Sequence, residues 1–216
     1  NDTTPSYVFT TNEAGTITTN ITEGFSTSAS AANGNNTVTF NTLGEGTYAS
    51  KTVTVTDASG NASSLTLTTF VVDTTAPTMT ITATEVSDGD TSNDSTIALT
   101  FTSSQATSNF IAGDITVAGG SLGSLTAVST TVYTATFTPS SDGATTINVA
   151  GGAFTDLAGN NNTAATEFNW TYDGTAPTLT VYSDTSGVTD GSTTNDSTIS
   201  MVFVSSEATS NFVVGD

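Results

Sequence analysis

The sequence predicts an all-β protein made of tandem two-sheet β-sandwiches, and three observations support this. Apolar and polar residues alternate along many short segments, as they do in strands that bury one face. No segment carries apolar residues at the spacing of an amphipathic helix. A unit of about 100 residues is repeated, so the chain contains more than one copy of the same fold.

The repeat is marked by a linker motif and by a second, longer match. Residues 73–78 (DTTAPT) return as residues 173–178 (DGTAPT), which is an offset of 100 positions. Residues 103–110 (SSQATSNF) return as residues 205–212 (SSEATSNF), an offset of 102. The later copy therefore has a two-residue insertion between these motifs, as expected for a loop.

The linkers divide the chain into three units: residues 1–73, 74–173 and 174–216. The third unit stops at Asp216, the counterpart of Asp114, less than halfway through a copy. Because two strands cannot bury a core by themselves, we expect the sequence to be a window of a longer repetitive chain. The alternative is that a partner supplies the missing strands.

In the second unit, seven strands are expected, and those at residues 78–84 and 96–102 alternate apolar with polar residues most clearly. The seven lie in residues 78–84, 96–102, 114–117, 122–128, 132–137, 145–149 and 167–172. Seven short strands with polar turns between them are typical of an aligned two-sheet sandwich. On the last strand Phe168, Trp170 and Tyr172 share one face, and we expect these aromatic side chains in the core. The alternative is an exposed platform on which a sugar stacks.

The first unit is shorter and follows the same pattern. Its expected strands are residues 7–10, 16–21, 36–41, 50–57 and 65–73. Tyr48 follows the turn 43–47 (LGEGT), which is the position of a tyrosine corner, where the phenol bonds to the backbone of the preceding turn. Thr145 stands at the matching position of the second unit, so the corner is absent there.

Composition excludes most catalytic chemistry. The 216 residues include one Lys or Arg, 20 Asp or Glu, no His and no Cys, for a net charge of −19. Without His or Cys there is no imidazole base, thiolate nucleophile or soft-metal site, and we predict that the protein is not an enzyme. The negative charge excludes nucleic acid as a partner, and no apolar run is long enough for membrane insertion.

The linkers, the corner at residues 43–48 and the matching turns 57–61 (DASGN) and 156–160 (DLAGN) resemble the bacterial immunoglobulin-like (Ig-like) repeats of giant surface adhesins. The resemblance covers the whole chain. It implies tandem Ig-like modules that act as spacers in long secreted proteins, often stiffened by calcium at the module junctions. It also aligns Glu23 and Lys51 with a cysteine pair of relatives, so Lys51 either forms an ion pair with Glu23 or is solvated.

Calcium is the one cofactor that this inventory of oxygen ligands allows. We expect candidate ligands in the loops that meet at the two junctions. At the first junction Glu13, Glu45 and Asp73 are expected to face Asp156 and the amides of Gln105 and Asn160. At the second junction, the more acidic one, the candidates are Asp88, Asp90, Asp142, Asp173 and Glu207. The other interpretation is that these residues form turns and keep the surface soluble.

The expected function is mechanical: an extracellular spacer at the cell surface whose partners are the neighbouring modules of the same chain. Each linker is short and contains Pro, which restricts the backbone at and before the ring. Two other functions stay open. In the first, the chain is a subunit of a self-assembling filament or sheath and binds other copies. In the second, it is an adhesive module that binds a surface glycan.

Overall fold

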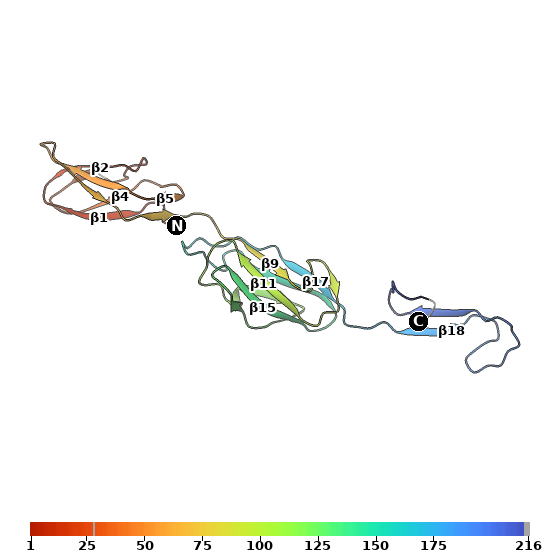
Figure 1. Ribbon diagram of the computed structural model, residues 1–216. Coiled ribbons are helices and arrows are strands. Elements are labelled where there is room, and N and C mark those ends of the chain that lie inside the picture. The colour runs from red at the N-terminus through yellow and green to blue at the C-terminus, as the bar shows by residue number, and fades with distance from the viewer. Residues whose placement is uncertain (28, 214–216) are drawn as a thin grey trace.

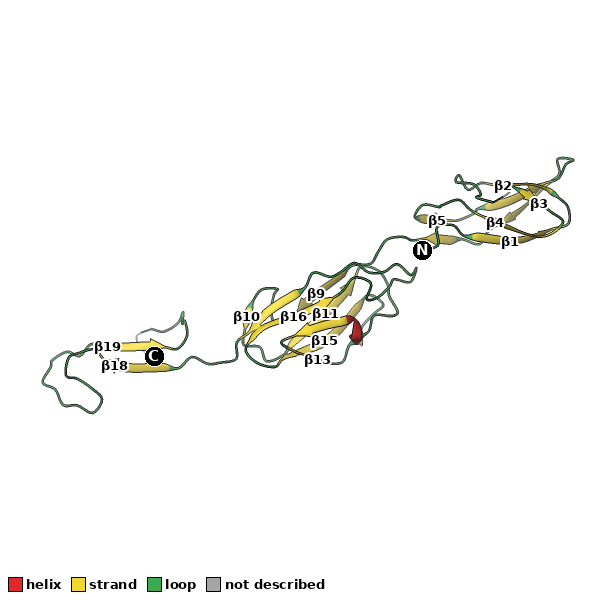
Figure 2. Ribbon diagram, turned by 180° about the vertical axis from the view of Figure 1, so that it is seen from behind, coloured by secondary structure: helices red, strands yellow, loops and turns green. Residues whose placement is uncertain are grey.

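The computed structural model describes residues 1–27 and 29–213, and Asp216, at which the third unit stops, lies outside the described residues. Three units follow one another along an extended chain (Figure 1). We call them the N-terminal unit (residues 1–73), the central module (74–173) and the C-terminal segment (174–213). The described residues are almost entirely strands and loops (Figure 2), with one short 3₁₀ turn at Ala112–Asp114.

The central module is a sandwich of two sheets. The first sheet has the order β13-β15-β11-β9, with β14 also on β15; its strands are β9 (Met79–Ala83), β11 (Ile97–Ser103), β13 (Gly120–Leu122), β14 (Thr126–Ala127) and β15 (Val132–Pro139). The second has the order β10-β17-β16-β12; its strands are β10 (Thr91–Ser92), β12 (Ile115–Ala118), β16 (Gly143–Val149) and β17 (Phe168–Tyr172). Neighbouring strands are antiparallel except β10 and β17, which are parallel.

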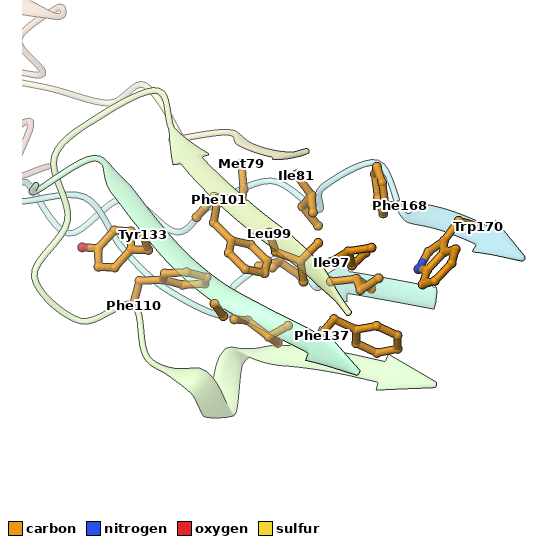
Figure 3. Close-up of a cluster of buried hydrophobic side chains, with 14 of the residues drawn as sticks. Met79, Ile81, Ile97, Leu99, Phe101, Phe110, Tyr133, Phe137, Phe168 and Trp170 are labelled. Atoms are coloured by element: carbon orange, nitrogen blue, oxygen red, sulfur yellow. The ribbon is translucent and has the colours of Figure 1, made fainter. Parts of the chain in front are cut away.

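Alternation along the strands builds the core between these sheets. In β11, Ile97, Leu99 and Phe101 point inward and are buried, while the residues between them face outward or are partly exposed. Phe168 and Trp170 reach the same core from the opposite sheet (Figure 3). Full burial of such a side chain contributes roughly 1.5–3 kcal/mol, so the alternating pattern fixes which face of each strand is inside.

The N-terminal unit has a separate core. Its strands are β1 (Ser6–Thr11), β2 (Gly15–Thr19), β3 (Ser30–Ala31), β4 (Gly34–Thr39), β5 (Gly46–Tyr48), β6 (Thr52–Thr56), β7 (Ala62–Thr66) and β8 (Phe70–Val72). A four-stranded sheet has the order β3-β2-β6-β7, and two strand pairs, β1-β4 and β5-β8, complete the unit. Val38, Phe40 and Val53 are among the side chains buried between these elements.

Several predicted strands differ from the observed ones. The predicted strand 65–73 is broken, because β7 pairs with β6 whereas β8 pairs with β5, and Leu67 between them donates its N–H to Lys51 O. The predicted strand 122–128 is likewise two short strands on β15. The very short β3, β5 and β10 were not predicted, since two or three residues carry no measurable alternation.

The tyrosine corner is confirmed. Tyr48 Oη donates a hydrogen bond of 3.0 Å to Gly44 O, in the turn that precedes β5. In the central module the buried Thr145 Oγ1 instead donates to Trp170 O at 3.0 Å, on the neighbouring strand. Lys51 Nζ lies 5.8 Å from the centroid of the Tyr48 ring, a cation–π distance. The ion pair of Lys51 with Glu23 is not among the contacts of the described residues.

The C-terminal segment repeats the first two long strands of the central module. β18 (Leu179–Ser183) and β19 (Met201–Ser205) are antiparallel, with Leu179 opposite Ser205. This register equals that of β9 and β11, where Met79 is opposite Ser103. The two inserted residues therefore lie in the loop between the strands, as the change of offset predicted.

Candidate functional site

The best-defined polar site is the first junction, where the linker after β8 is held from both sides. On the N-terminal side, the Glu45 carboxylate accepts hydrogen bonds from Thr75 Oγ1 (2.6 Å) and Thr74 Oγ1 (3.2 Å). These bonds from Thr75 and Thr74 lower the pKa of Glu45, because they stabilise its ionised form. Glu45 thus ties the linker to the turn that carries the tyrosine corner.

The central module holds the same linker with two side-chain amides. Gln105 Nε2 donates to Thr75 O at 2.7 Å, and Asn160 Nδ2 donates to Asp73 O at 2.9 Å. Ser104 Oγ adds a third contact by accepting the N–H of Thr78 at 2.9 Å. Thr163 N–H and Ser104 N–H also donate to Pro77 O and Thr78 O. Four linker carbonyls and one linker N–H are therefore paired with the central module, which limits the rotation of the chain between the units.

Asn160 is positioned by the loop 156–160. The Asp156 carboxylate accepts the Asn160 backbone N–H and the Asn160 Nδ2, both at 2.9 Å, and both residues are buried. Burial by itself would raise the pKa of Asp156, but the hydrogen bonds from Asn160 and from the backbone of the loop outweigh it, and the pKa is lowered. The ionised Asp156 therefore keeps Asn160 turned toward the linker.

The N-terminal unit contains the same loop without a linker contact. Asp57 accepts the Asn61 backbone N–H at 2.8 Å and Asn61 Nδ2 at 2.9 Å. The side-chain and backbone bonds from Asn61 lower the pKa of Asp57. The pairs 57–61 and 156–160 thus share their internal bonds, and Asn160 differs by its additional bond to Asp73 O.

The second junction is held differently. Asp142 accepts the Gly174 N–H at 2.7 Å and also the Thr175 hydroxyl, and the bonds from Thr175 and Gly174 lower its pKa. Glu207 stands where the first junction has Gln105. An ionised carboxylate has no proton to donate, so Glu207 cannot form the bond to the linker carbonyl that Gln105 forms.

The expectation that Glu13 lies at the first junction is wrong. Glu13 lines a surface depression with Asp57 and Asn61, at the tip of the β6–β7 hairpin. The chain starts next to the central module, where Asn1 Nδ2 donates to Gly159 O at 3.1 Å, and β1 runs away from it (Figure 1). Glu13, in the loop after β1, is therefore carried to the other end of the unit.

The remaining acidic candidates bond to nearby backbone groups. Asp88 accepts the Asn169 N–H at 2.7 Å, and Asp90 accepts the Ser87 N–H at 2.8 Å. Asp73 and Asp173 each accept the N–H of the residue two positions later, at 3.0 Å and 3.3 Å. Among the residues that the structure describes, no three acidic side chains are grouped so that they could hold a metal ion. Calcium at the junctions stays a prediction.

The aromatic side chains of β17 belong to the core. Trp170 is 2% exposed and Phe168 is 5% exposed, while Tyr172 is partly buried and packs edge-on against Trp170, with ring centroids 6.0 Å apart. The expectation that they lie in the core is confirmed, and the alternative of a sugar-stacking platform on this face is wrong.

A feature that the sequence analysis missed is the apolar surface of the C-terminal segment. The inward-facing positions of β18 and β19 are about half exposed, because no second sheet covers them among the described residues. The outward face is also apolar: Tyr182, Val202 and Val204 stand where the central module has threonine. Residue-by-residue comparison of the two copies could have revealed this difference.

The class of protein follows from the central module, since two largely antiparallel sheets of short strands packed around one core define an immunoglobulin-like β-sandwich. Residues 73–172 match the family of bacterial Ig-like domains, and this part of the chain is a bacterial Ig-like domain. Such domains are structural or adhesive modules, typically non-enzymatic and often exposed at the surface.

No described helix has the length and apolar character needed to cross a membrane. A search of the curated proteins found no match.

Proposed function

We propose that the chain is part of the stalk of a long extracellular repeat protein, in which residues 1–73, 74–173 and 174–216 are successive Ig-like modules. Its task is to keep whatever lies beyond it at a set distance from the cell surface. The observation that carries this proposal is the first junction, where Glu45, Gln105 and Asn160 bond to one short linker from both sides.

A spacer needs junctions that resist bending. Each of the six linker residues, 73–78, is either hydrogen-bonded or restricted by Pro77, so few backbone dihedral angles are free. Pro77 fixes its own φ and favours an extended conformation of the residue before it. The charge of −19 adds repulsion between units, although at physiological salt it acts over only about 8 Å. Hydrogen bonds at the linker are therefore the main source of stiffness, with charge as a secondary one.

The test is a distance distribution between spin labels on the N-terminal unit and the central module of the full chain. The wild-type chain should give one narrow distribution. Replacing both amides, Gln105→Ala with Asn160→Ala, should broaden it, while Asn61→Ala, which removes the matching loop bond away from the junction, should leave it unchanged. A distribution that is equally broad for the wild type and the double variant would contradict the spacer function.

A second candidate function is a subunit of a filament or sheath, favoured by the outward face of β18 and β19, where Tyr182, Val202 and Val204 replace threonines of the central module. A filament contact buries about 1,200 Å² or more. Sedimentation velocity over a hundredfold range of concentration distinguishes the two functions, since a spacer stays monomeric and a filament subunit forms a ladder of oligomers.

A further inference from the structure

Tension along the chain passes through the first and the last strands of the central module. The chain enters this module at the linker 73–78 and leaves it after β17, and these two points lie at opposite ends of the module (Figure 1). A pull on the chain therefore draws the entering segment toward one end and β17 toward the other. The way in which these two segments are joined decides how the module responds to tension.

The entering segment, residues 79–92, contacts both sheets. Its first part, β9, is antiparallel to β11 in the first sheet, and its last part, β10, is parallel to β17 in the second. The loop between these strands is held to the module. The Glu85 carboxylate accepts the Ala98 N–H at 2.7 Å, and the side chain of Val86 is only 6% exposed. The segment therefore crosses from one sheet to the other before the chain turns into β11.

Four hydrogen bonds join residues 88–92 to residues 169–173, and we call this ladder the clamp. Three of them connect backbone groups at 2.7–3.0 Å: Gly89 N–H to Asn169 O, Thr171 N–H to Asp90 O, and Asp173 N–H to Ser92 O. In the fourth, Asn169 N–H donates to Asp88 Oδ1 at 2.7 Å. Asp88 thus lengthens the ladder by one bond beyond Gly89, whose φ of 86° departs from strand geometry.

The direction of the two strands decides how the clamp is loaded. Because β10 and β17 are parallel and are drawn toward opposite ends, tension slides one strand along the other. The hydrogen bonds of a parallel pair are evenly spaced between the strands, so the four bonds share the load and break in one step. If the strands were pulled apart from one end, the same bonds would break one after another.

The other side of the clamp is anchored in the core. β17 is paired with β16 from Phe168 to Tyr172. Its Phe168 and Trp170 side chains are buried between the sheets (Figure 3). The buried Thr145 hydroxyl also donates to Trp170 O at 3.0 Å. Tension on β17 is therefore passed to the whole sandwich, and the clamp is the direct connection between the entering segment and this strand.

We propose that the central module is a tension-bearing unit and that the clamp sets how long it stays folded under tension. This inference rests on the proposed function for its setting, since a stalk that is fixed at one end and held at the other carries tension. It goes beyond that function, because a spacer needs only stiff linkers. Asp88, which the sequence analysis offered as a calcium ligand, has a mechanical role here as an acceptor in the clamp.

The test measures the lifetime of the folded module at constant force in single molecules of the full chain. The chain has no cysteine, so introduced cysteines define the two points of pull. Ala76→Cys with Ala176→Cys applies tension between entry and exit. Ser95→Cys with Ala176→Cys places both points beyond the same end of the clamp, because Ser95 follows β10 and Ala176 follows β17. At one force the first pair should give a lifetime about a hundredfold longer, since three more bonds break in the same step.

Two substitutions in the entry-to-exit pair identify the clamp. Asp88→Ala removes one of its four bonds and should shorten the lifetime about fivefold. Tyr133→Phe is the matched control: it also removes one hydrogen bond, from Tyr133 Oη to Thr107 O at 3.2 Å, but outside the clamp. It should leave the lifetime unchanged. The midpoint of guanidinium unfolding, followed by Trp170 emission, shows that both variants fold and how much stability each has lost.

Equal lifetimes in the two directions of pull would overturn the proposal. So would a lifetime shortened as much by Tyr133→Phe as by Asp88→Ala, because it would then follow overall stability and not the clamp. The two proposals fail separately. A broad spin-label distribution would contradict the spacer function and would leave these lifetimes as they are, since the clamp lies within the central module and the spin labels report on the first linker.

Discussion

Asn160→Ala tests whether the loop 156–160 couples the central module to the linker. The substitution removes two hydrogen bonds of the Asn160 side chain, one to the Asp156 carboxylate and one to Asp73 O. The backbone bond from Asn160 to Asp156 remains. Asp156 stays buried with one hydrogen-bond donor fewer, so the decrease in the free energy of unfolding includes the cost of a poorly compensated charge.

The magnitude follows from these bonds. A hydrogen bond to a charged group is worth about 1.5–3 kcal/mol and one to a neutral carbonyl about 0.5–1.5 kcal/mol. Water can reach the edge of the junction and replace part of this hydrogen bonding, so we expect the free energy of unfolding of the central module to fall by about 2 kcal/mol. For a module of this size such a loss lowers the melting temperature by about 10 °C.

The assay is guanidinium unfolding at neutral pH, followed by tryptophan emission. Trp170 is the only tryptophan of the chain and is buried in the central module, so its signal reports on that module. With a slope of about 4 kcal/mol per molar for this size, Asn160→Ala should lower the midpoint by about 0.5 M. Asn61→Ala removes the matching loop bond in the other unit and should leave the tryptophan transition in place. A shift no larger for Asn160→Ala than for Asn61→Ala would refute the coupling.

Four further predictions use the same chain. Phe101→Ala should destabilise the central module by about 3–5 kcal/mol, whereas Phe203→Ala at the matching exposed position should leave the Trp170 transition unchanged. Tyr48→Phe removes the bond to Gly44 O and should cost the N-terminal unit about 1 kcal/mol, seen by circular dichroism with no change in tryptophan emission. The pKa of Asp156 is lowered on folding, so its contribution is present above the unfolded value and is lost as pH falls through the folded one; the Trp170 midpoint should drop below about pH 4, and less so in Asn160→Ala. If calcium binds at the second junction, melting and small-angle scattering with calcium and with chelator should differ, and identical curves would remove the metal from the account.

The fold was predictable because its long strands carry their own signal. β9, β11, β15 and β17 each alternate over at least five residues, and the burial of every second side chain follows that alternation. The short strands were not predictable, since their partners and not their own sequence determine them. The parallel contact of β10 with β17 is an example: it depends on where the long loop before β11 returns to the sandwich.

The junction was predictable only in part. Gln105 and Asn160 were expected to face the first linker, because the loops at one end of a sandwich are known once the strand order is known. Glu13 was misplaced because the chain starts beside the central module and β1 runs away from it, so the loop after β1 lies at the far end of the unit. Sequence reasoning offered the acidic residues as calcium ligands or as turn formers, and the structure brings two of them, Glu45 and Asp142, to the linkers as acceptors for Thr74, Thr75, Gly174 and Thr175.

Comparison of the two junctions separates what every linker shares from what each one adds. Ser104 Oγ accepts the N–H of Thr78 at 2.9 Å, and Ser206 Oγ accepts the N–H of Thr178 at 2.8 Å. The residue after each of these serines, Gln105 or Glu207, donates its backbone N–H at 3.4 Å to the serine two positions before it. Only the end of that next side chain differs, an amide in Gln105 and a carboxylate in Glu207. Because the amide donates and the ionised carboxylate cannot, one change of functional group decides whether the linker carbonyl is bonded. The repeat therefore preserves how the chain enters each unit, and the residue at this position determines whether the following unit donates a side-chain hydrogen bond to the linker carbonyl.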